Sequence, residues 1–383
     1  VRALSVDCGF QKQKLQTSRV ASPMERWSAY SEKRSSWMWP TQKVFVRIEA
    51  DDGQVGWSCT NGGEVVALII NAHLSRFVAD RTIDAISEVW DQMFNSLLPN
   101  DRSGFAMMAV SGVDIALWDL KAKMSGQSLV DLLGGATQQN LSVYATTDQP
   151  ESFAGPWWGL KAAMPHGPSS GDEGATANRA LMERFRGAAG RDRRIMLDAF
   201  MAWDADYTIR FAKSCKDLDI FWVEDPLPSY DLAGLRRIKR ELGSDIRLAL
   251  GNFCFNRWDC EQLLDNGLVD ILQPDVAWAG GVTECLRILD MAKQSDVPVV
   301  LHNTSEQPWA IAMAAARQTD PVVEFVDRGE GSPLYSLMSA PVLPTAGQVV
   351  VPSDLVGNRP PEHIIEIFEA DDPSLVQNQN QGG

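Results

Sequence analysis

Eight short apolar runs, separated by helical patterns, constrain the fold of this chain more than any other feature. They begin at about residue 141, and most follow one another at intervals of 20–30 residues. In order they are LSVYAT, WGLKAAM, IMLDAF, IFWVED, RLALGN, VDILQPD, VPVVLHN and VVEFVD. Strands that are apolar throughout and alternate with helices are typical of a parallel sheet covered on both faces. Eight such units over residues 141–340 predict a (β/α)₈-type barrel rather than an open sheet.

Residues 1–140 follow a different pattern. The stretch KVFVRIEADDGQVGWS, residues 43–58, alternates apolar and polar side chains around an Asp-Gly pair, which predicts a β-hairpin. Helical periodicity follows at about 64–79, 82–97 and 103–125, and the segment LVDLLGG ends on a glycine stop signal. We therefore expect an α+β domain before the barrel.

Two segments lack a clear period. Residues 11–40 are rich in polar side chains and tryptophan, and a long loop of this kind predicts either a lid over a site or a disordered segment. The tail from 341 returns to irregular structure, and its last ten residues, SLVQNQNQGG, are predicted to be disordered.

Charge and composition exclude several classes of partner. The chain has 383 residues and a net charge of −15, so polyanions such as nucleic acids and anionic membranes are repelled. A small anionic substrate held by a local cation remains compatible with this charge. No apolar run approaches 18 residues, so no transmembrane segment is predicted. The six cysteines include no CxxC pair, which favours a reducing, cytoplasmic location without disulfides.

Seven of the eight runs carry a polar residue at or near their carboxyl end. In parallel barrels these ends form the active-site face, so we expect the seven side chains to converge. Each also has a structural interpretation, as a helix cap, a turn residue or a satisfied buried group. The seven residues are Lys161, Asp198, Glu224, Asn252, Asp275, His302 and Glu324.

The chemistry of these residue types indicates a metal site beside a base. Asp198 and Glu224 are hard oxygen ligands that suit Mg²⁺, whereas Asn252 adds a carbonyl oxygen without charge. Asp275 and His302 can form a dyad in which the carboxylate fixes the imidazole tautomer. A metal-bound carboxylate substrate beside such a base suggests abstraction of the proton α to that carboxylate.

The order and spacing of several motifs resemble the enolase superfamily, in its mandelate racemase subgroup, and within it the rhamnonate dehydratases. The resemblance extends over most of the chain. Its motifs are ASPM (21–24), VDIALWDL (113–120), LLGGA (132–136), MLDAF, WVEDPL, LQPDVAWAGGVTE (272–284) and VVLHNTS (299–305).

This resemblance implies a modified TIM barrel, (β/α)₇β, under an α+β capping domain completed by the C-terminal segment. It implies Mg²⁺ held at Asp198, Glu224 and position 252. His302, oriented by Asp275, would act as base and then as acid. Lys161 would belong to the catalytic set, and Glu324 would assist at the enediolate or bind the substrate carboxylate. The implied reaction removes water from a sugar acid to give a 2-keto-3-deoxy acid, in a homo-oligomer.

The sequence departs from the family pattern at three places. Ala163 stands where racemising relatives have a second lysine, which favours one-faced dehydration over racemisation. Asn252 stands where relatives have a glutamate, which lowers the charge of the ligand set. Residues 1–40 contain no histidine, although the lid of the rhamnonate enzymes carries one. A sugar-acid-binding homologue without turnover, and an epimerase or other lyase of the same fold, therefore remain as alternatives.

Tryptophans give one further expectation. Trp278, with Trp37 or Trp39, is expected to line the substrate pocket, because these residues flank the barrel mouth and the lid. Filling of the domain interface is the alternative for the same side chains.

Overall fold

The structure is a computed structural model that describes residues 1–6, 20–32, 36–37, 42–329, 332, 342–351 and 359–370. Trp39, much of the predicted lid loop and the C-terminal tail lie outside these residues.

A small antiparallel sheet opens the chain, in the order β1-β2-β3. Its strands are β1 (Arg2–Val6), β2 (Lys43–Glu49) and β3 (Val55–Thr60). The predicted hairpin is confirmed, because β2 and β3 pair in register from Val44 with Thr60 to Glu49 with Val55. The turn between them places Gly53 at a φ of 84°, a conformation that favours glycine.

Helices cover this sheet, as the periodicity predicts. They are α2 (Gly63–Ile69), α3 (Ser75–Val78), α4 (Ile86–Leu97), α5 (Gly104–Ser125) and α6 (Leu129–Leu132). The first predicted helix is interrupted by a π-helical turn at Ile70–Leu74, which periodicity does not reveal. Helix α5 lies directly on β3: a Cβ at Gly56 would approach the Ala116 carbonyl oxygen to 2.2 Å, so only glycine fits there.

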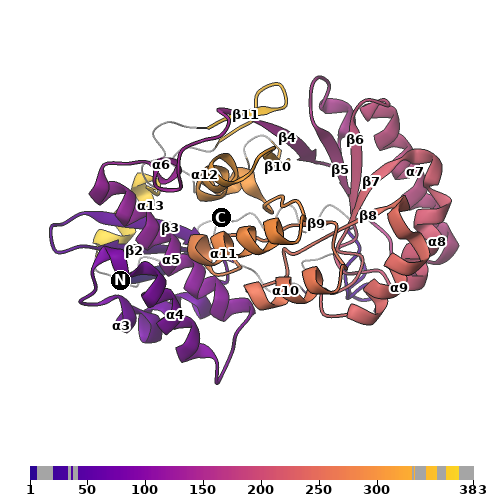
Figure 1. Cartoon of the computed structure of the whole chain (residues 1–383). Helices are drawn as coiled ribbons and strands as arrows, with labels where there is room; N and C mark the ends of the chain where they lie inside the picture. The colour runs from indigo at the N-terminus through magenta and orange to yellow at the C-terminus, as the bar shows by residue number, and fades with distance from the viewer. Residues whose placement is uncertain are drawn as a thin grey trace.

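A curled parallel sheet forms the second part of the molecule, as expected for a TIM-barrel-like fold (Figure 1). Its strand order is β10-β4-β5-β6-β7-β8-β9, in sequence order except for β10, which returns beside β4. The strands are β4 (Asn140–Thr146), β5 (Gly159–Ala163), β6 (Arg194–Asp198), β7 (Ile220–Glu224), β8 (Arg247–Leu250), β9 (Ile271–Leu272) and β10 (Val322–Val326).

The run VPVVLHN differs from the prediction, because it forms a single parallel bridge between Val299 and Leu272 instead of a strand. Two backbone hydrogen bonds hold it there, from Leu272 N to Pro298 O and from Val300 N to Leu272 O, both 2.9 Å. Pro298 has no N–H group, so the ladder cannot extend through it.

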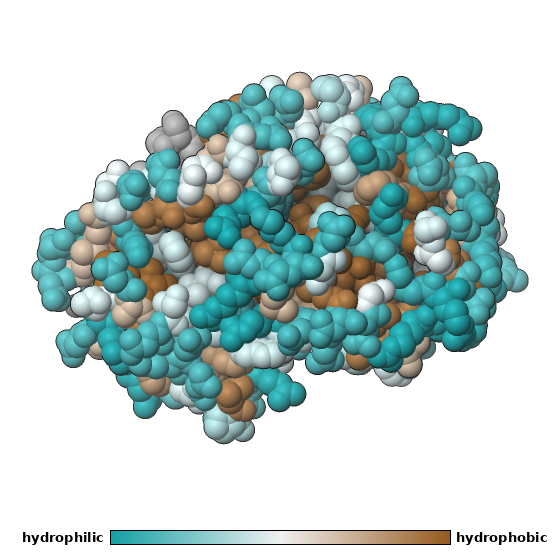
Figure 2. Space-filling view, viewed as in Figure 1, coloured by the Kyte–Doolittle hydropathy of each residue, from teal (hydrophilic) through white to brown (hydrophobic). Residues whose placement is uncertain are grey.

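Helices pack around the outside of this sheet. They are α7 (Gly171–Ala189), α8 (Ala205–Ser214), α9 (Leu232–Leu242), α10 (Arg257–Asp265), α11 (Gly281–Gln294) and α12 (Pro308–Arg317). The face drawn in Figure 2 is mostly hydrophilic, with apolar side chains visible in the seams between elements. Among the described residues, none of the helices has the length and apolar character needed to cross a membrane.

The end of the described chain contacts both parts of the molecule. Strand β11 (Gln348–Val350) pairs antiparallel with β4 of the barrel sheet. Helix α13 (Glu362–Glu369) then lies beside β2 and β3 (Figure 1), where Ile364 and Phe368 pack against Phe45 and Trp57.

Two layers of side chains fill the inside of the barrel. The lower layer is an apolar cluster with one residue from most of the strands: Tyr144, Met196, Trp222, Ala249, Ile271, Val300 and Val322. Side chains alternate along a strand, so the residues two positions later point into the barrel as well. This upper layer consists of Thr146, Asp198, Glu224, Gly251, Gln273, His302 and Glu324, together with Lys161, which lies two positions after Gly159 on β5.

The two domains are joined at the segment that follows β9. Trp90 Nε1 donates to the Gly280 carbonyl oxygen at 2.7 Å, and Thr60 Oγ1 donates to the Ala277 carbonyl oxygen at 2.8 Å. The Gly280 amide donates to Ser111 Oγ at 2.8 Å. Side chains of the capping domain therefore hold the backbone between Asp275 and the start of α11.

Candidate active site

A histidine–aspartate pair lies at the mouth of the barrel. His302 Nδ1 and Asp275 Oδ2 are 2.8 Å apart, and Asp275 is fully buried while 18% of the His302 side chain is exposed. The other Asp275 oxygen accepts from the Ala277 amide at 2.8 Å and from Gln307 Nε2 at 2.9 Å. Because Nδ1 is engaged, proton exchange with a bound molecule falls to Nε2.

The environment raises the pKa of His302 above its ordinary value. Burial alone lowers this pKa, but the hydrogen bond with Asp275 and the nearby charge of Glu324 outweigh it. The imidazole is therefore a stronger base than an exposed histidine, and it holds a captured proton more tightly.

Lys161 connects two carboxylates in the barrel interior. Its Nζ lies 2.7 Å from both oxygens of Glu224 and 2.8 Å from Glu324 Oε1, and all three side chains are buried. Burial lowers the pKa of Lys161, but the charges of Glu224 and Glu324 raise it well above its usual value. Lys161 is therefore an ammonium ion here rather than a free base.

The carboxylate of Glu324 is held by three donors. Besides Lys161, Thr146 Oγ1 donates to it at 2.6 Å and the Asn303 amide donates at 2.7 Å. Burial raises the pKa of Glu324, but Lys161 and His302 lower it further, to about 2. Glu324 is consequently anionic across the physiological range.

The pKa of Glu224 is shifted in the opposite direction to that of Glu324. Burial raises its pKa to about 7, with the charges of Asp198 and Glu324 adding to the rise and Lys161 opposing it. Trp222 Nε1 at 3.2 Å and Gln273 Nε2 at 3.1 Å also donate to it. A cation close to Glu224 would favour its charged form, because it adds the opposite charge next to the carboxylate.

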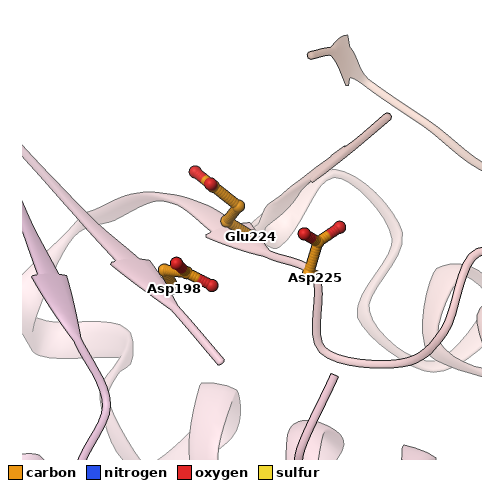
Figure 3. A group of neighbouring side chains, drawn as sticks. All are labelled: Asp198, Glu224 and Asp225. Atoms are coloured by element: carbon orange, nitrogen blue, oxygen red, sulfur yellow. The ribbon is translucent and has the colours of Figure 1, made fainter. Parts of the chain in front are cut away.

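Three carboxylates gather at the ends of β6 and β7 (Figure 3). One oxygen each of Asp198, Glu224 and Asp225 lies within 4.8 Å of the others. Asp198 Oδ1 also accepts from the Phe200 amide at 2.8 Å. Burial, and then the charges of Glu224 and Asp198, raise the pKa of Asp225 well above its usual value.

Asn252 lies beside this cluster, in the loop after β8. The loop passes close to β9, because Gly251 has a φ of 137° and a Cβ there would meet the Gln273 amide nitrogen at 2.7 Å. The Asn252 side chain hydrogen-bonds Asp225, while its Oδ1 is buried and has no partner among the described residues. Clustered carboxylates with an unpartnered amide oxygen form a donor set that fits Mg²⁺.

Aromatic rings continue from the dyad across the mouth. The ring centroids of Trp278 and His302 are 5.2 Å apart, those of Phe253 and Trp278 5.8 Å, and those of Phe200 and Phe253 5.7 Å. Trp278 Nε1 is buried without a described partner, and so is Nε1 of the half-buried Trp37. The described contacts place Trp278 at the site and join Trp37 to none of the other predicted residues.

The convergence predicted for the strand ends is therefore observed, with Lys161, Glu224, Asp198 and Glu324 in one network and Asp275 with His302 beside it. Sequence reasoning missed Thr146 and Gln273, which bind Glu324 and Glu224. Their position two residues after a buried apolar residue could have revealed both. It also missed Asp225, which resembles an ordinary turn residue before Pro226.

Several solved structures are similar to this chain in fold and sequence. L-rhamnonate dehydratase from Gibberella zeae is 30% identical, with a TM-score of 0.86, over 93% of this chain and 91% of its own. The rhamnonate dehydratase from Gibberella zeae complexed with Mg is 28% identical, with a TM-score of 0.86 over 94% and 91%. L-talarate dehydratase from a Polaromonas species, complexed with Mg and L-glucarate, is 25% identical, with a TM-score of 0.69 over 82% and 88%.

Two family models match the chain. Residues 36–134 match the N-terminal domain of the mandelate racemase / muconate lactonizing enzyme family. Residues 161–356, more than half of the chain, match the enolase C-terminal domain-like family. Members of this superfamily use Mg²⁺, as the magnesium-bound relatives illustrate. The chain belongs to the enolase superfamily, in the mandelate racemase subgroup.

Proposed function

We propose that this chain is a Mg²⁺-dependent dehydratase of sugar acids, and that its substrate is an L-rhamnonate-like acid. The observation that carries the proposal is the hydrogen bond between His302 and Asp275, because it places one acid–base group beside a cluster of hard oxygen ligands. The similarity to L-rhamnonate dehydratase supports the substrate class.

The metal would be held by Asp198 and Glu224, with the Asn252 amide oxygen beside them. When bound, Mg²⁺ supplies positive charge that stabilises the negative charge developing on the substrate carboxylate. The raised pKa of Glu224 and the unpartnered Asn252 oxygen both support a cation at this place.

His302 moves the proton. The neutral imidazole, donating Nδ1–H to Asp275, accepts the C2 proton of the substrate on Nε2. The imidazolium then gives this proton to the C3 hydroxyl, which leaves as water when the C3–O bond breaks. The electron pair of the former C2–H bond becomes the C2=C3 double bond of an enol. Protonation at C3 and loss of the proton from the C2 hydroxyl then convert the enol into a 2-keto-3-deoxy acid.

Lys161 and Glu324 set the charge around this step. Lys161 remains an ammonium between two carboxylates, so it offers no second base for racemisation from the other face. Glu324 is fixed as an anion, and its negative charge helps His302 to retain the captured proton until the hydroxyl leaves. Trp278 would cover one side of the substrate, with Trp37 contributing from the lid.

The test is a screen of the purified protein with millimolar Mg²⁺ against five- and six-carbon sugar acids, with the 2-keto-3-deoxy product as readout. We expect turnover of L-rhamnonate or a close stereoisomer. His302→Asn should reduce turnover by about 10²- to 10⁴-fold, because the base and the acid are lost together. His73→Asn is the matched control, because His73 lies in the capping domain, bonded to Ser96. Unchanged turnover in His302→Asn contradicts the mechanism.

A second candidate function rests on the amide at position 252. A ligand set with one carboxylate fewer binds hard cations more weakly, so the chain could bind sugar acids without turning them over. Such a protein is stabilised by the acid in thermal unfolding yet forms no product with any metal. Product formation by Asn252→Glu alone would identify a site disabled at one ligand.

A further inference from the structure

Asp225 is the one carboxylate of the cluster to which the proposed function gives no role. It directly follows β7, is 2% exposed and has a φ of 38°, in a region that residues other than glycine seldom adopt. Its amide donates to the Ala249 carbonyl oxygen at 3.0 Å, and its carbonyl oxygen accepts from the Met201 amide at 2.7 Å. The backbone bonds from both sides maintain this conformation.

The left-handed backbone changes where the side chain lies. Strict alternation along β7 would send Asp225 to the face opposite Glu224. Instead, one of its oxygens lies within 4.8 Å of an oxygen of Asp198 and one of Glu224 (Figure 3). At a metal–oxygen distance of about 2.1 Å, two oxygens of one Mg²⁺ are about 3 Å apart when adjacent and about 4.2 Å apart when opposite, so the three carboxylates must move closer together to bind one cation.

An independent observation indicates that this place is incomplete without a ligand. Oδ2 of Asp225 and Oδ1 of Asn252 are both buried and have no hydrogen-bond partner among the residues that the structure describes. Burial of an unpartnered polar oxygen is destabilising, and more so when the group is charged. The Asn252 side chain, 4% exposed, is a hydrogen-bond partner of the Asp225 side chain.

We propose that Asp225 is the third anionic ligand of the metal, and that Asn252 positions it. The inference rests on the metal site of the proposed function and changes its ligand set from two carboxylates and an amide to three carboxylates. The site then regains the charge of −3 that an amide at position 252 alone would leave at −2. The Asn252 oxygen remains close to the cation, as a further neutral donor.

The first experiment measures Mn²⁺ and Mg²⁺ binding to the metal-free full chain by isothermal titration calorimetry. Asp225→Asn should raise Kd by about 100-fold, at the upper end of the losses seen when groups supporting a metal site are removed. Asp259→Asn is the control, because Asp259 lies outside the cluster, in the first turn of α10, where it accepts from the Phe255 amide. The control should bind with unchanged Kd. Equal Kd values for the unaltered chain and Asp225→Asn overturn the proposal.

The second experiment needs no variant and remains decisive if Asp225→Asn does not fold. Crystals of the unaltered chain are soaked in Mn²⁺, and the anomalous difference peak is located. A peak at metal–oxygen distance from Asp225 supports the proposal, and a peak that contacts Asn252 but not Asp225 overturns it. Absence of any metal binding overturns the proposed function as well, whereas binding through Asp225 without turnover leaves the inference intact and counts against the dehydratase.

Discussion

The two layers inside the barrel differ by one step of two residues along the same strands. The lower layer is apolar, and Tyr144, Met196 and Trp222 are fully buried in it. The upper layer contains the buried carboxylates Glu224 and Glu324 beside the partly exposed His302. Burial alone therefore does not separate structural from chemical positions in this barrel. The two layers differ in their contacts: the lower layer packs apolar side chains together, whereas the upper layer pairs charged groups of opposite sign.

Substitutions in the two layers are therefore expected to have different effects on stability and on chemistry. Loss of volume in the lower layer leaves a cavity, which costs stability and leaves the chemistry above it in place. Loss of one charge in the upper layer leaves another charge buried without compensation, which costs stability and chemistry together.

The largest effect is expected for Lys161→Met, which removes the cation shared by Glu224 and Glu324. The free energy of unfolding in urea at pH 8, with EDTA present, should fall by about 3–5 kcal/mol, because two buried carboxylates lose their partner. Lys239→Met is the matched control: its ion pair with Asp270 is partly exposed, so its removal should cost about 1 kcal/mol or less. Equal losses in the two variants would mean that the upper layer is well solvated.

Met196→Ala tests the lower layer directly below the site. Met196 packs against Gly159 and is fully buried, so truncation should lower the free energy of unfolding by about 2–4 kcal/mol. The Kd for Mn²⁺ should change less than threefold, about 0.7 kcal/mol, because no charged group is altered. Urea unfolding and metal titration of the same preparation give both values. A large loss of metal affinity would show that the layers are mechanically coupled.

Asp275→Asn sharpens the comparison through pH. Burial lowers the pKa of His302, and the bond with Asp275 and the charge of Glu324 more than reverse this. Activity needs neutral imidazole, so it is present above this pKa and is lost as the pH falls through it. Removal of the Asp275 charge lowers the pKa, so the acid limb of kcat/KM should move to lower pH. The plateau should fall by about 100-fold, because the base is weaker and its tautomer is no longer fixed.

A pH–rate profile of the variant against the unaltered chain, with kcat resolved from KM, measures both effects. An acid limb at the same pH in the two proteins would mean that a group other than His302 accepts the proton.

Much of the fold could be predicted from the sequence. The apolar runs predicted the parallel sheet, and the Asp-Gly pair predicted the hairpin of β2 and β3. The run VPVVLHN is predicted to be a strand but forms a single bridge, because periodicity carries no information on whether Pro298 interrupts a hydrogen-bond ladder. The π-helical turn at Ile70–Leu74 was missed for a similar reason, since one extra residue per turn hardly alters an apolar stripe.

The candidate site was predicted in part. The strand-end rule found Asp198, Glu224 and the pair of Asp275 with His302, because each strand delivers its tip to the same face. It could not find Asp225, whose side chain joins the cluster only through a left-handed backbone that no sequence pattern signals. The state of Lys161 was also hidden, since it depends on two carboxylates contributed by distant strands.

Trp90 and Thr60 donate hydrogen bonds to the segment after β9, and the Gly280 amide of that segment donates one to Ser111, so the two domains cannot be exchanged independently. The backbone segment that carries Asp275 and Trp278 belongs to the barrel but is held in place by side chains of the capping domain. Transplanting the barrel under a foreign cap would carry over every upper-layer side chain but remove the supports of the dyad. Substitutions in α5 and β3 that break these hydrogen bonds are therefore expected to change the position of the dyad, although neither element carries Asp275 or His302.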